Sequence, residues 1–244
     1  MCKLNENERI DALQVDGLRM IQAQDGYRFS LDPFLLADFS AVRKGDRVID
    51  LGTASGILPL IIAATTEVQS VVGVELQQPL YDRALRNVEL NGLCDKVTIR
   101  LLDVRNIVKE KSFPTGGFEV VLMNPPYRIT TAGRLSAGGE RAACRHELNG
   151  TINDFLRASH WLVRHGGAVC LIFLAERLPE LLRQMQLCSL EPKRLRMIHS
   201  DRKRDAHLVL VEGRKGGRPG LTVQSPLYIY EEGEYTEEIR RIFN

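Results

Sequence analysis

Val48-Ile49-Asp50-Leu51-Gly52-Thr53-Ala54-Ser55-Gly56-Ile57-Leu58 is the stretch of sequence that decides the fold. A short β-branched run, a turn of small residues and a second apolar run predict a strand, a tight turn and a helix. Gly52 and Gly56 allow the backbone to approach a ligand and the helix to pack closely on the strand. Their spacing does not fit the G-x-G-x-x-G pattern of dinucleotide-binding proteins. The turn therefore suits a ligand without phosphate groups.

From Arg47 onward, short β-branched runs alternate with helical stretches, which is typical of a parallel sheet covered on both faces. We expect strands at Arg47–Leu51, Ser70–Glu75, Val97–Leu101, Phe118–Met123 and Ala168–Phe173, with helices at Ile57–Thr65, Pro79–Asn91, Ile152–Val163 and Arg177–Leu187. Two further strands, Arg196–His199 and His207–Glu212, are separated only by a turn and predict an antiparallel hairpin at the sheet edge. The predicted fold is α/β and Rossmann-like, with a mostly parallel seven-stranded sheet, a C-terminal antiparallel hairpin and helices on both faces.

The chain on either side of this sheet is predicted to be short. Asp32 and Pro33 have the pattern of an N-cap followed by the first helical position, opening a helix over Phe34–Val42. Leu221–Tyr230 is expected to be extended and to precede a short C-terminal helix. Residues 1–43 are thus an N-terminal extension with a helix covering the ligand site, and residues 44–244 form one catalytic domain.

Composition excludes several classes of protein. The 244 residues contain five cysteines without a C-x-x-C pair and five histidines without ligand spacing, so neither a disulfide framework nor a metal site is predicted. The apolar runs are too short to cross a membrane, and Met1–Arg9 is polar rather than signal-like. We expect a cytoplasmic protein with no membrane partner and no obligate protein partner.

Two acidic residues follow the glycine turn at the ends of successive predicted strands. Glu75 comes about 20 residues after the turn, where a carboxylate can accept hydrogen bonds from both hydroxyls of a ribose. Asp103 follows the next strand, where its side chain and the Val104 amide could meet an adenine edge. In a doubly wound sheet these strand ends lie side by side, at the position where such folds bind ligands. Each acid alone is an ordinary strand-end residue, but the glycine turn, Glu75 and Asp103 in this order indicate a nucleoside site.

The tetrapeptide Asn124-Pro125-Pro126-Tyr127 ends the fourth strand. Proline donates no N–H and disfavours helical geometry in the residue before it, so the local carbonyls stay unpaired. The Asn124 side-chain oxygen and the Pro125 backbone oxygen could accept both hydrogens of an amino group, and Tyr127 offers a stacking face. The alternative is a plain proline turn. The tetrapeptide nevertheless fits a site that holds an amino group on a planar molecule.

Positive charge is concentrated between Lys193 and Arg218, although the formal net charge of the chain is only +2. Such an excess attracts a polyanion with an affinity that falls as salt rises, whereas the alternative is a solvated surface. The basic residues that we expect to contact a nucleic acid are Arg202, Lys203, Arg204, Arg214 and Lys215.

Together, the segment Asp50–Gly56, Glu75, Asp103 and Asn124–Tyr127 resemble the class I S-adenosylmethionine-dependent methyltransferases that methylate amino groups. Tyr27–Asp32, Glu140–Glu147 and Val211–Gly217 make the chain similar to the bacterial valine-tRNA adenine-N(6) methyltransferases, which modify the adenine next to the anticodon. That family usually has glycine where Ala54 stands. Alanine fits there only if the position keeps a negative φ.

The resemblance implies S-adenosylmethionine as cofactor, a valine tRNA as substrate, and a role for each motif residue. Asp50, Gly52 and Thr53 would border the methionine moiety, with Gly56 allowing close helix packing. Glu75 would bind the ribose, and Asp103 with Val104 the cofactor adenine. The target base would be held by Asn124, Pro125 and Tyr127. Either Asp32 or the backbone around Ser30 and Leu31 would close over the methionine end.

Three other activities stay open at this point. A release-factor type methyltransferase grips a glutamine amide with the same tetrapeptide, and a ribosomal RNA guanine amino-methyltransferase is also possible. A non-catalytic RNA-binding module would not need the intact tetrapeptide. The basic segment and the absence of a recognisable helical substrate-binding domain before the sheet favour nucleic acid. Residues 128–150 form a long connection of the kind that often serves as a lid or binding element.

Overall fold

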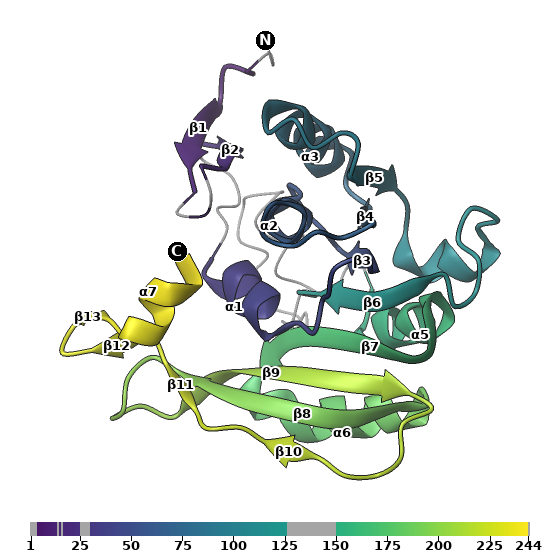
Figure 1. The fold of residues 1–244 in the computed structure, drawn as a ribbon, viewed down its shortest axis with the longest axis vertical. Helices are drawn as coiled ribbons and strands as arrows, with labels where there is room; N and C mark the ends of the chain where they lie inside the picture. Colours follow the sequence, from purple (N-terminus) through teal and green to yellow (C-terminus); the bar gives the residue numbers. More distant parts are fainter. Residues whose placement is uncertain (1–3, 14, 16, 25–29, 126–149, 244) are drawn as a thin grey trace, which may run out of the picture.

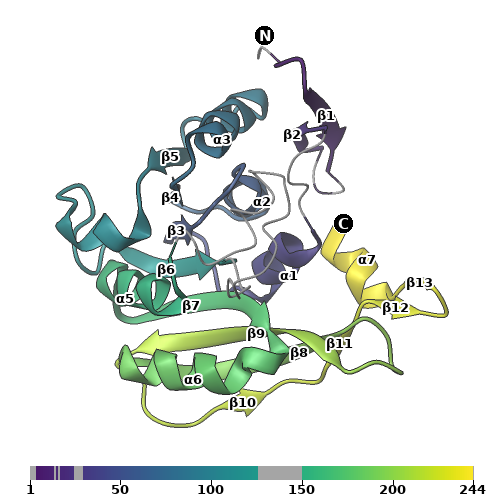
Figure 2. The same cartoon turned by 180° about the vertical axis from the view of Figure 1, so that it is seen from behind.

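The computed structural model describes residues 4–13, 15, 17–24, 30–125 and 150–243 of the chain. Pro126, Tyr127, residues 128–149 and Tyr27–Phe29 lie outside these ranges, so the predictions made for them remain predictions. Figure 1 shows the fold and its element labels, and Figure 2 shows it from behind.

A sheet of nine strands forms the centre of the structure, in the order β10-β8-β9-β7-β6-β3-β4-β5, with β11 also paired to β8. The parallel part comprises β3 (Arg47–Leu51), β4 (Ser70–Glu75), β5 (Val97–Leu101), β6 (Phe118–Met123) and β7 (Val163–Leu174). The antiparallel hairpin of β8 (Leu190–His199) and β9 (Ala206–Lys215) continues from β7, and β10 (Thr222–Val223) and β11 (Leu227–Tyr228) run parallel to β8. The seven predicted strands are confirmed, and two short strands widen the sheet beyond them.

Helices cover both faces of the sheet. One face is covered by α1 (Asp32–Phe39), α2 (Ile57–Thr65) and α3 (Gln78–Leu90), and the other by η1 (Val104–Lys109), α5 (Ile152–Leu162) and α6 (Leu178–Leu187). A short 3-10 segment, η3 (Ala175–Arg177), leads from β7 into α6. Alternate strand residues supply two cores: Cys170 and Ile172 of β7 belong to the first, and Leu171 and Phe173 to the second. This alternation is the two-residue period of a strand buried on both faces.

Two hairpins and a helix lie outside the central sheet. An N-terminal hairpin of β1 (Glu8–Ala12) and β2 (Arg19–Ala23) packs beside α3, and sequence analysis did not predict it. At the other end, β12 (Tyr230–Glu231) and β13 (Glu234–Tyr235) form a small hairpin before α7 (Glu237–Phe243). The predicted C-terminal helix is therefore confirmed, and its Ile239 is buried in the core that contains α1.

The start of α1 corrects one prediction. Leu31 occupies the N-cap position, and Asp32 lies in the first turn rather than before the helix. The helix also ends at Phe39, earlier than the predicted Val42, because Ser40 is extended and its hydroxyl bonds back to the Ala37 carbonyl at 2.7 Å. Phe34, Leu35, Leu36 and Phe39 are all buried, so α1 is anchored in the core by its apolar side chains.

Candidate active site

The carboxyl ends of β6, β3, β4 and β5 lie side by side in that order. Asp50 of β3 is level with Leu122 of β6 and Gly73 of β4, and Glu75 is level with Leu101 of β5. Since neighbouring strands are about 4.8 Å apart, these four strand ends span about 15 Å of the sheet edge. The predicted site residues at the ends of these strands are therefore brought together, with Asn124 at one end of the row and Asp103 at the other.

The turn after β3 is tied to β4. The Gly52 and Thr53 amides both donate to the Val74 carbonyl at 2.9 Å, and Gly56, in the left-handed region at φ 86°, precedes α2. A Cβ at Gly56 would lie 3.2 Å from the Ala84 Cβ of α3. Gly56 is thus required both for its backbone conformation and for the close approach of α3, whereas the sequence predicted only close packing of a helix on the strand.

Ala54 corrects a further prediction, because its φ is +51° rather than negative. A non-glycine residue in this region carries a cost of roughly 1 kcal/mol. The conformation aims the Ala54 amide at Glu75, whose Oε2 accepts its hydrogen bond at 2.8 Å. The turn is therefore held by the same carboxylate that we predict to bind the cofactor ribose.

Glu75 is 5% exposed and accepts three backbone hydrogen bonds, from Ala54 and, through Oε1, from Leu76 at 2.9 Å and Gln77 at 2.8 Å. Burial raises the pKa of this carboxyl, and the three amides offset part of the rise. A carboxylate has about four acceptor positions. Glu75 is thus a preorganised acceptor with about one position left for a ligand hydroxyl.

Asp50 is the most deeply buried carboxylate of the row, at 2% exposed. Burial raises its pKa to about 7, the nearby Thr53 side chain lowers it, and the charge of Glu75 raises it. The Thr53 hydroxyl is itself buried and has no hydrogen-bond partner in the described part of the chain. Two buried carboxylates with raised pKa values and an unpartnered hydroxyl form a donor and acceptor set that fits a cationic, hydroxyl-bearing ligand.

Asp103 follows β5 and caps η1. Its Oδ1 accepts from the Arg105 amide and from Arg105 Nε, both at 2.9 Å, and its Oδ2 also accepts from the guanidinium. The Arg105 guanidinium holds the pKa of this carboxyl below its ordinary value. Val104 is buried beside it. Recognition of an adenine edge by Asp103 would therefore compete with Arg105.

Asn124 and Pro125 follow β6 at the level of the glycine turn. Asn124 is half-buried and Pro125 is buried. Within the described ranges, the Asn124 side chain forms no hydrogen bond. Its amide is therefore available to a ligand, and its role in holding an amino group stays a prediction.

Two residues of this site were not predicted from the sequence. Phe155 of α5 packs under the turn, where a Cβ at Gly52 would lie 3.3 Å from its ring. Asn87 of α3 is completely buried and donates to the Ser55 carbonyl at 2.9 Å. The available signal for Asn87 was its place on the apolar face of α3 beside Ala84 and Val88, where an amide is unusual.

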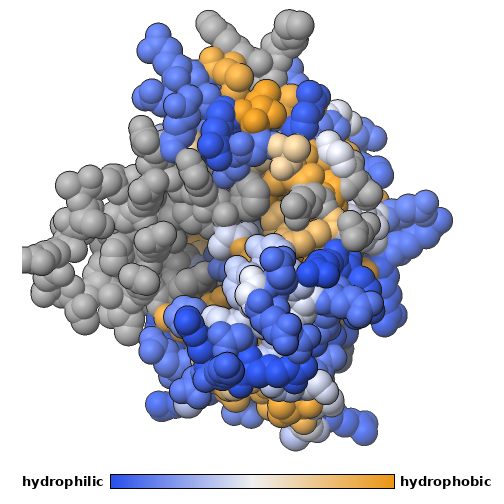
Figure 3. Space-filling model, turned by 90° about the vertical axis from the view of Figure 1, so that its left-hand side faces the viewer, coloured by the Kyte–Doolittle hydropathy of each residue, from blue (hydrophilic) through white to orange (hydrophobic). Residues whose placement is uncertain are grey.

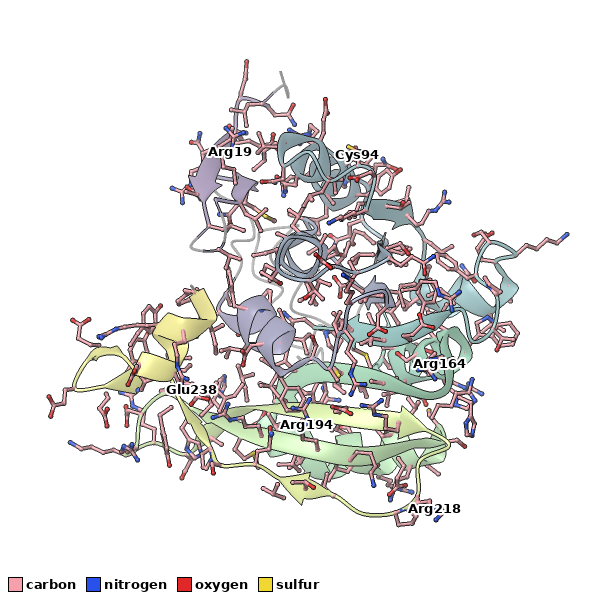
Figure 4. All side chains as sticks on the ribbon, in the orientation of Figure 1. Arg19, Cys94, Arg164, Arg194, Arg218 and Glu238 are labelled. Carbon is pink, nitrogen blue, oxygen red and sulfur yellow. The ribbon has the colours of Figure 1, made fainter. Side chains whose placement is uncertain are left out.

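The predicted RNA-binding residues separate into two groups, one at each end of the strands of the sheet. Because β9 pairs antiparallel to β7 from Leu208 opposite Leu174 to Arg214 opposite Ala168, the turn with Arg202, Lys203 and Arg204 lies at the carboxyl edge that also carries Asn124. Arg214 and Lys215 lie at the other edge. In Figure 4 the labelled Arg218 lies toward the side of Arg214 and Lys215, and the labelled Glu238 of α7 lies toward the opposite side, that of the β8–β9 turn.

The structure gives most of these basic residues internal partners. Arg202 pairs with Glu231 at 3.2 Å and lies over the Tyr228 ring, and Arg204 pairs with Asp201 at 3.4 Å. Arg214 pairs with Glu212, while Lys215 Nζ donates to the carbonyls of His160 and Val163 at the end of α5. Burial lowers the pKa of Lys215.

Figure 3 shows the side of the molecule that lies on the left in Figure 1, and hydrophilic residues cover much of the lower part of this view. Over the described ranges we find no group of acidic, histidine and cysteine side chains that could hold a metal ion. Nor is any described helix long and apolar enough to cross a membrane.

Comparison with known proteins agrees with this geometry. Residues 35–116 match a family described as a methyltransferase domain. A structure from Agrobacterium tumefaciens described as a predicted O-methyltransferase superimposes with a TM-score of 0.70 and 25% identity, over 87% of this chain and 95% of that one. Geranyl diphosphate C-methyltransferase from Streptomyces coelicolor, at 13% identity and a TM-score of 0.56, covers 75% of this chain and 79% of its own, and shows the same fold.

Curated relatives align along most of the chain. The tRNA1(Val) (adenine(37)-N6)-methyltransferase of Mannheimia succiniciproducens is 29% identical over 85% of this chain and 82% of its own length. Proteins of the same name from Dyadobacter fermentans and Photobacterium profundum are 22% and 24% identical, over 90% and 87% of this chain and 89% and 88% of their own lengths. With its strand-end acids, its glycine turn and its Asn-Pro-Pro-Tyr sequence, this chain has the fold of the class I S-adenosylmethionine-dependent methyltransferases and is similar along most of its length to the tRNA1(Val) (adenine(37)-N6)-methyltransferases.

Proposed function

We propose that this protein transfers a methyl group from S-adenosylmethionine to the exocyclic amine of an adenine in tRNA, next to the anticodon of a valine tRNA. The observation that carries the proposal is the position of Asn124 and Pro125 beside the glycine turn of β3, on adjacent strands of one sheet edge. The names of the curated relatives support the choice of substrate. Because tRNA is the substrate, we also propose that the protein acts in the cytoplasm.

The cofactor would lie along the row of strand ends. Asp50, Gly52 and Thr53 would border its methionine part, Glu75 its ribose, and Asp103 with the Val104 amide its adenine. S-adenosylmethionine supplies a methyl group on a positively charged sulfur. The buried carboxylates of Asp50 and Glu75 support this placement, because a cationic ligand would stabilise their ionised forms.

The chain's own contribution to the reaction is alignment of the target amine. An adenine amine is a poor nucleophile because its lone pair is delocalised into the ring. Acceptance of its two hydrogens by the Asn124 side-chain oxygen and the Pro125 carbonyl favours a pyramidal nitrogen and aims the lone pair along the line of transfer. The amine becomes acidic only as the new bond forms, so its proton can leave late, through Asn124 or water, without a strong base.

The target base would be unstacked from the RNA, as enzymes acting on base atoms require. Tyr127 and the residues after it are proposed to line the base pocket. We further propose that residues 1–43 form an extension over the cofactor site, with Asp32 near the methionine end, and that residues 44–244 form the catalytic domain.

We propose that the β8–β9 turn contacts RNA phosphates, because Arg202, Lys203 and Arg204 lie at the sheet edge that carries Asn124. Changing these three residues to alanine should weaken tRNA binding and reduce the salt slope by about 0.7–0.9 for each phosphate that the variant no longer neutralises. A double variant, Arg214→Ala with Lys215→Ala, is compared with the triple variant. It changes the basic residues at the other end of the strands, where contact with RNA remains a prediction. An unchanged affinity and salt slope in the triple variant would remove the turn from the proposed surface.

Incubation with labelled S-adenosylmethionine and separate pools of tRNA, rRNA and protein tests the substrate directly. We expect label in N6-methyladenosine of tRNA. Label on glutamine would assign the protein to the release-factor type, and label on guanine of rRNA would support the other alternative.

The role of the tetrapeptide is tested by Asn124→Ala, with the exposed Asn106→Ala as the matched control. We expect turnover to fall at least about 100-fold in the first variant, with cofactor binding retained, and to stay unchanged in the second. Near-full turnover of a folded Asn124→Ala enzyme that still binds cofactor would show that the proposed alignment mechanism is wrong.

A further inference from the structure

One buried amide joins the cofactor turn to the N-terminal hairpin. Asn87 of α3 has no exposed surface. Its Nδ2 donates to the Ser55 carbonyl at 2.9 Å and to the Ile21 carbonyl at 3.3 Å, and its Oδ1 accepts from the Ile21 amide at 2.7 Å. Ser55 lies inside the glycine turn and Ile21 in β2, so a single side chain bonds to two segments that are far apart in the sequence.

The docking of β2 on α3 explains why an asparagine suits this position. Asn91, the C-cap residue of α3 and one turn after Asn87, bonds in the same way to Arg19: its Oδ1 accepts from the Arg19 amide at 2.9 Å, and its Nδ2 donates to the Arg19 carbonyl at 2.8 Å. Residues four apart on a helix are about 6 Å apart along its axis, close to the spacing of alternate residues on a strand, about 6.7 Å. The two asparagines therefore pair with the free edge of β2 as a neighbouring strand would. Arg19 is labelled on this hairpin in Figure 4.

An ion pair strengthens the same contact. Glu8 of β1 accepts from Arg83 Nε at 3.0 Å and from the Arg86 guanidinium, and hydrogen bonding from Arg86 holds its pKa at about 2. The Glu8 and Arg83 side chains are only 3% and 8% exposed. The ion pair therefore holds the hairpin against α3, and the fixed position of β2 keeps the Asn87 side chain in one orientation.

The difference between the two asparagines lies at the cofactor turn. Asn87 contacts the turn through the Ser55 carbonyl, whereas the contacts of Asn91 are with Arg19 and with the Asn87 carbonyl at 2.7 Å. Ser55 follows Ala54, whose strained conformation directs its amide to Glu75. A donor that fixes the next carbonyl keeps the peptide planes of this turn in place.

We infer that Asn87 is a positioning residue for cofactor binding, acting through the Ser55 carbonyl on a turn that it supports from behind. The inference rests on the proposed placement of the cofactor along residues 52–56. Asn87 sets the conformation of the turn, and with it the affinity for S-adenosylmethionine. The alignment of the target amine at Asn124 does not depend on it.

The experiment compares Asn87→Ala with the matched control Asn91→Ala. Both remove an asparagine that bonds to β2 from the C-terminal end of α3, but only the first removes a bond to the turn. We expect the Kd for S-adenosylhomocysteine, measured by calorimetry, and the KM for S-adenosylmethionine to rise about tenfold in Asn87→Ala, which corresponds to about 1.4 kcal/mol. In Asn91→Ala both should stay within about twofold of the unmodified protein, and kcat at saturating cofactor should stay within about twofold in both variants.

Several outcomes would overturn the inference. Equal cofactor affinity in Asn87→Ala and the unmodified protein would do so, as would equal weakening by both variants or a fall in kcat with unchanged affinity. If Asn87→Ala does not fold, Asn87→Asp replaces it, because aspartate keeps the acceptor for the Ile21 amide and loses both donors. Failure of the unmodified protein to bind the cofactor would instead refute the proposed cofactor site itself.

Discussion

Replacing Asp50 with asparagine should remove a large part of the pH dependence of stability in the ligand-free protein. Burial raises the pKa of Asp50 from an ordinary value of 3.8 to about 7. The fold therefore favours the protonated carboxyl. Its full contribution to stability is present below about pH 4 and is lost as the pH rises through about 7.

The magnitude follows from the shift. At 1.36 kcal/mol for each pKa unit between 3.8 and about 7, the protonated Asp50 carboxyl contributes about 4 kcal/mol to the free energy of unfolding. About 3 kcal/mol of this contribution is lost between pH 5 and pH 8. Structural relaxation and water entry reduce such values, so we expect this group to account for a loss of about 1–3 kcal/mol over that range. Asparagine has the same shape and no charge, so the Asp50→Asn variant should lose correspondingly less stability as the pH rises.

Urea denaturation of the ligand-free protein at pH 5, 6, 7 and 8, followed by circular dichroism, measures this difference. Asp95→Asn, at an exposed carboxylate, is the control and should behave as the unmodified protein does. Loss of the same free energy of unfolding between pH 5 and pH 8 in Asp50→Asn and in the unmodified protein would refute the reasoning. We also expect S-adenosylmethionine to bind more tightly as the pH rises from 6 to 8, and this trend should vanish in Asp50→Asn, because the cationic cofactor favours the ionised carboxyl.

Three further substitutions test the turn and the hairpin. Ala54→Gly should change the free energy of unfolding by less than about 0.5 kcal/mol in urea denaturation, since relief of the positive φ is offset by the greater freedom of glycine in the unfolded chain. Gly56→Ala should destabilise the protein by about 1–3 kcal/mol, because its φ is 86° and the new Cβ would lie 3.2 Å from the Ala84 Cβ; a neutral effect would show that α3 can move away. Glu8→Gln should cost about 1–3 kcal/mol at pH 7, measured by amide hydrogen exchange in β1 and β2. Since the pKa of Glu8 is lowered to about 2, this cost should shrink as the pH falls toward 2, and a cost independent of pH would contradict the ion-pair explanation.

The parallel strands and the helices between them were predictable because their cause is local. In β3, β4, β5 and β6 the observed bounds equal the predicted ones, and α2 also matches. Each strand is a β-branched run between turn residues, and each helix has an apolar face of the right period. β7, β8 and β9 extend further than predicted, because pairing to neighbouring strands carries polar residues such as Arg214 and Lys215 into the ladder.

The N-terminal hairpin could not be predicted in the same way. Its strands carry few apolar residues in a clear alternation, and its stability comes from Glu8 on two arginines and from two asparagines that pair with β2. These partners lie 66 to 78 residues away in the chain. A local pattern contains no information about contacts of that separation.

The candidate site likewise has features that follow from local sequence and features that depend on contacts between distant segments. The order of Gly52, Glu75, Asp103 and Asn124 along the chain was enough to place them at one sheet edge, because parallel strands end on the same side. Spacing alone did not reveal the positive φ of Ala54, the pairing of Asp103 with Arg105 or the bond from Asn87 to Ser55. Those features depend on which buried acceptor lies within reach of which donor, and that is decided only when distant segments pack together.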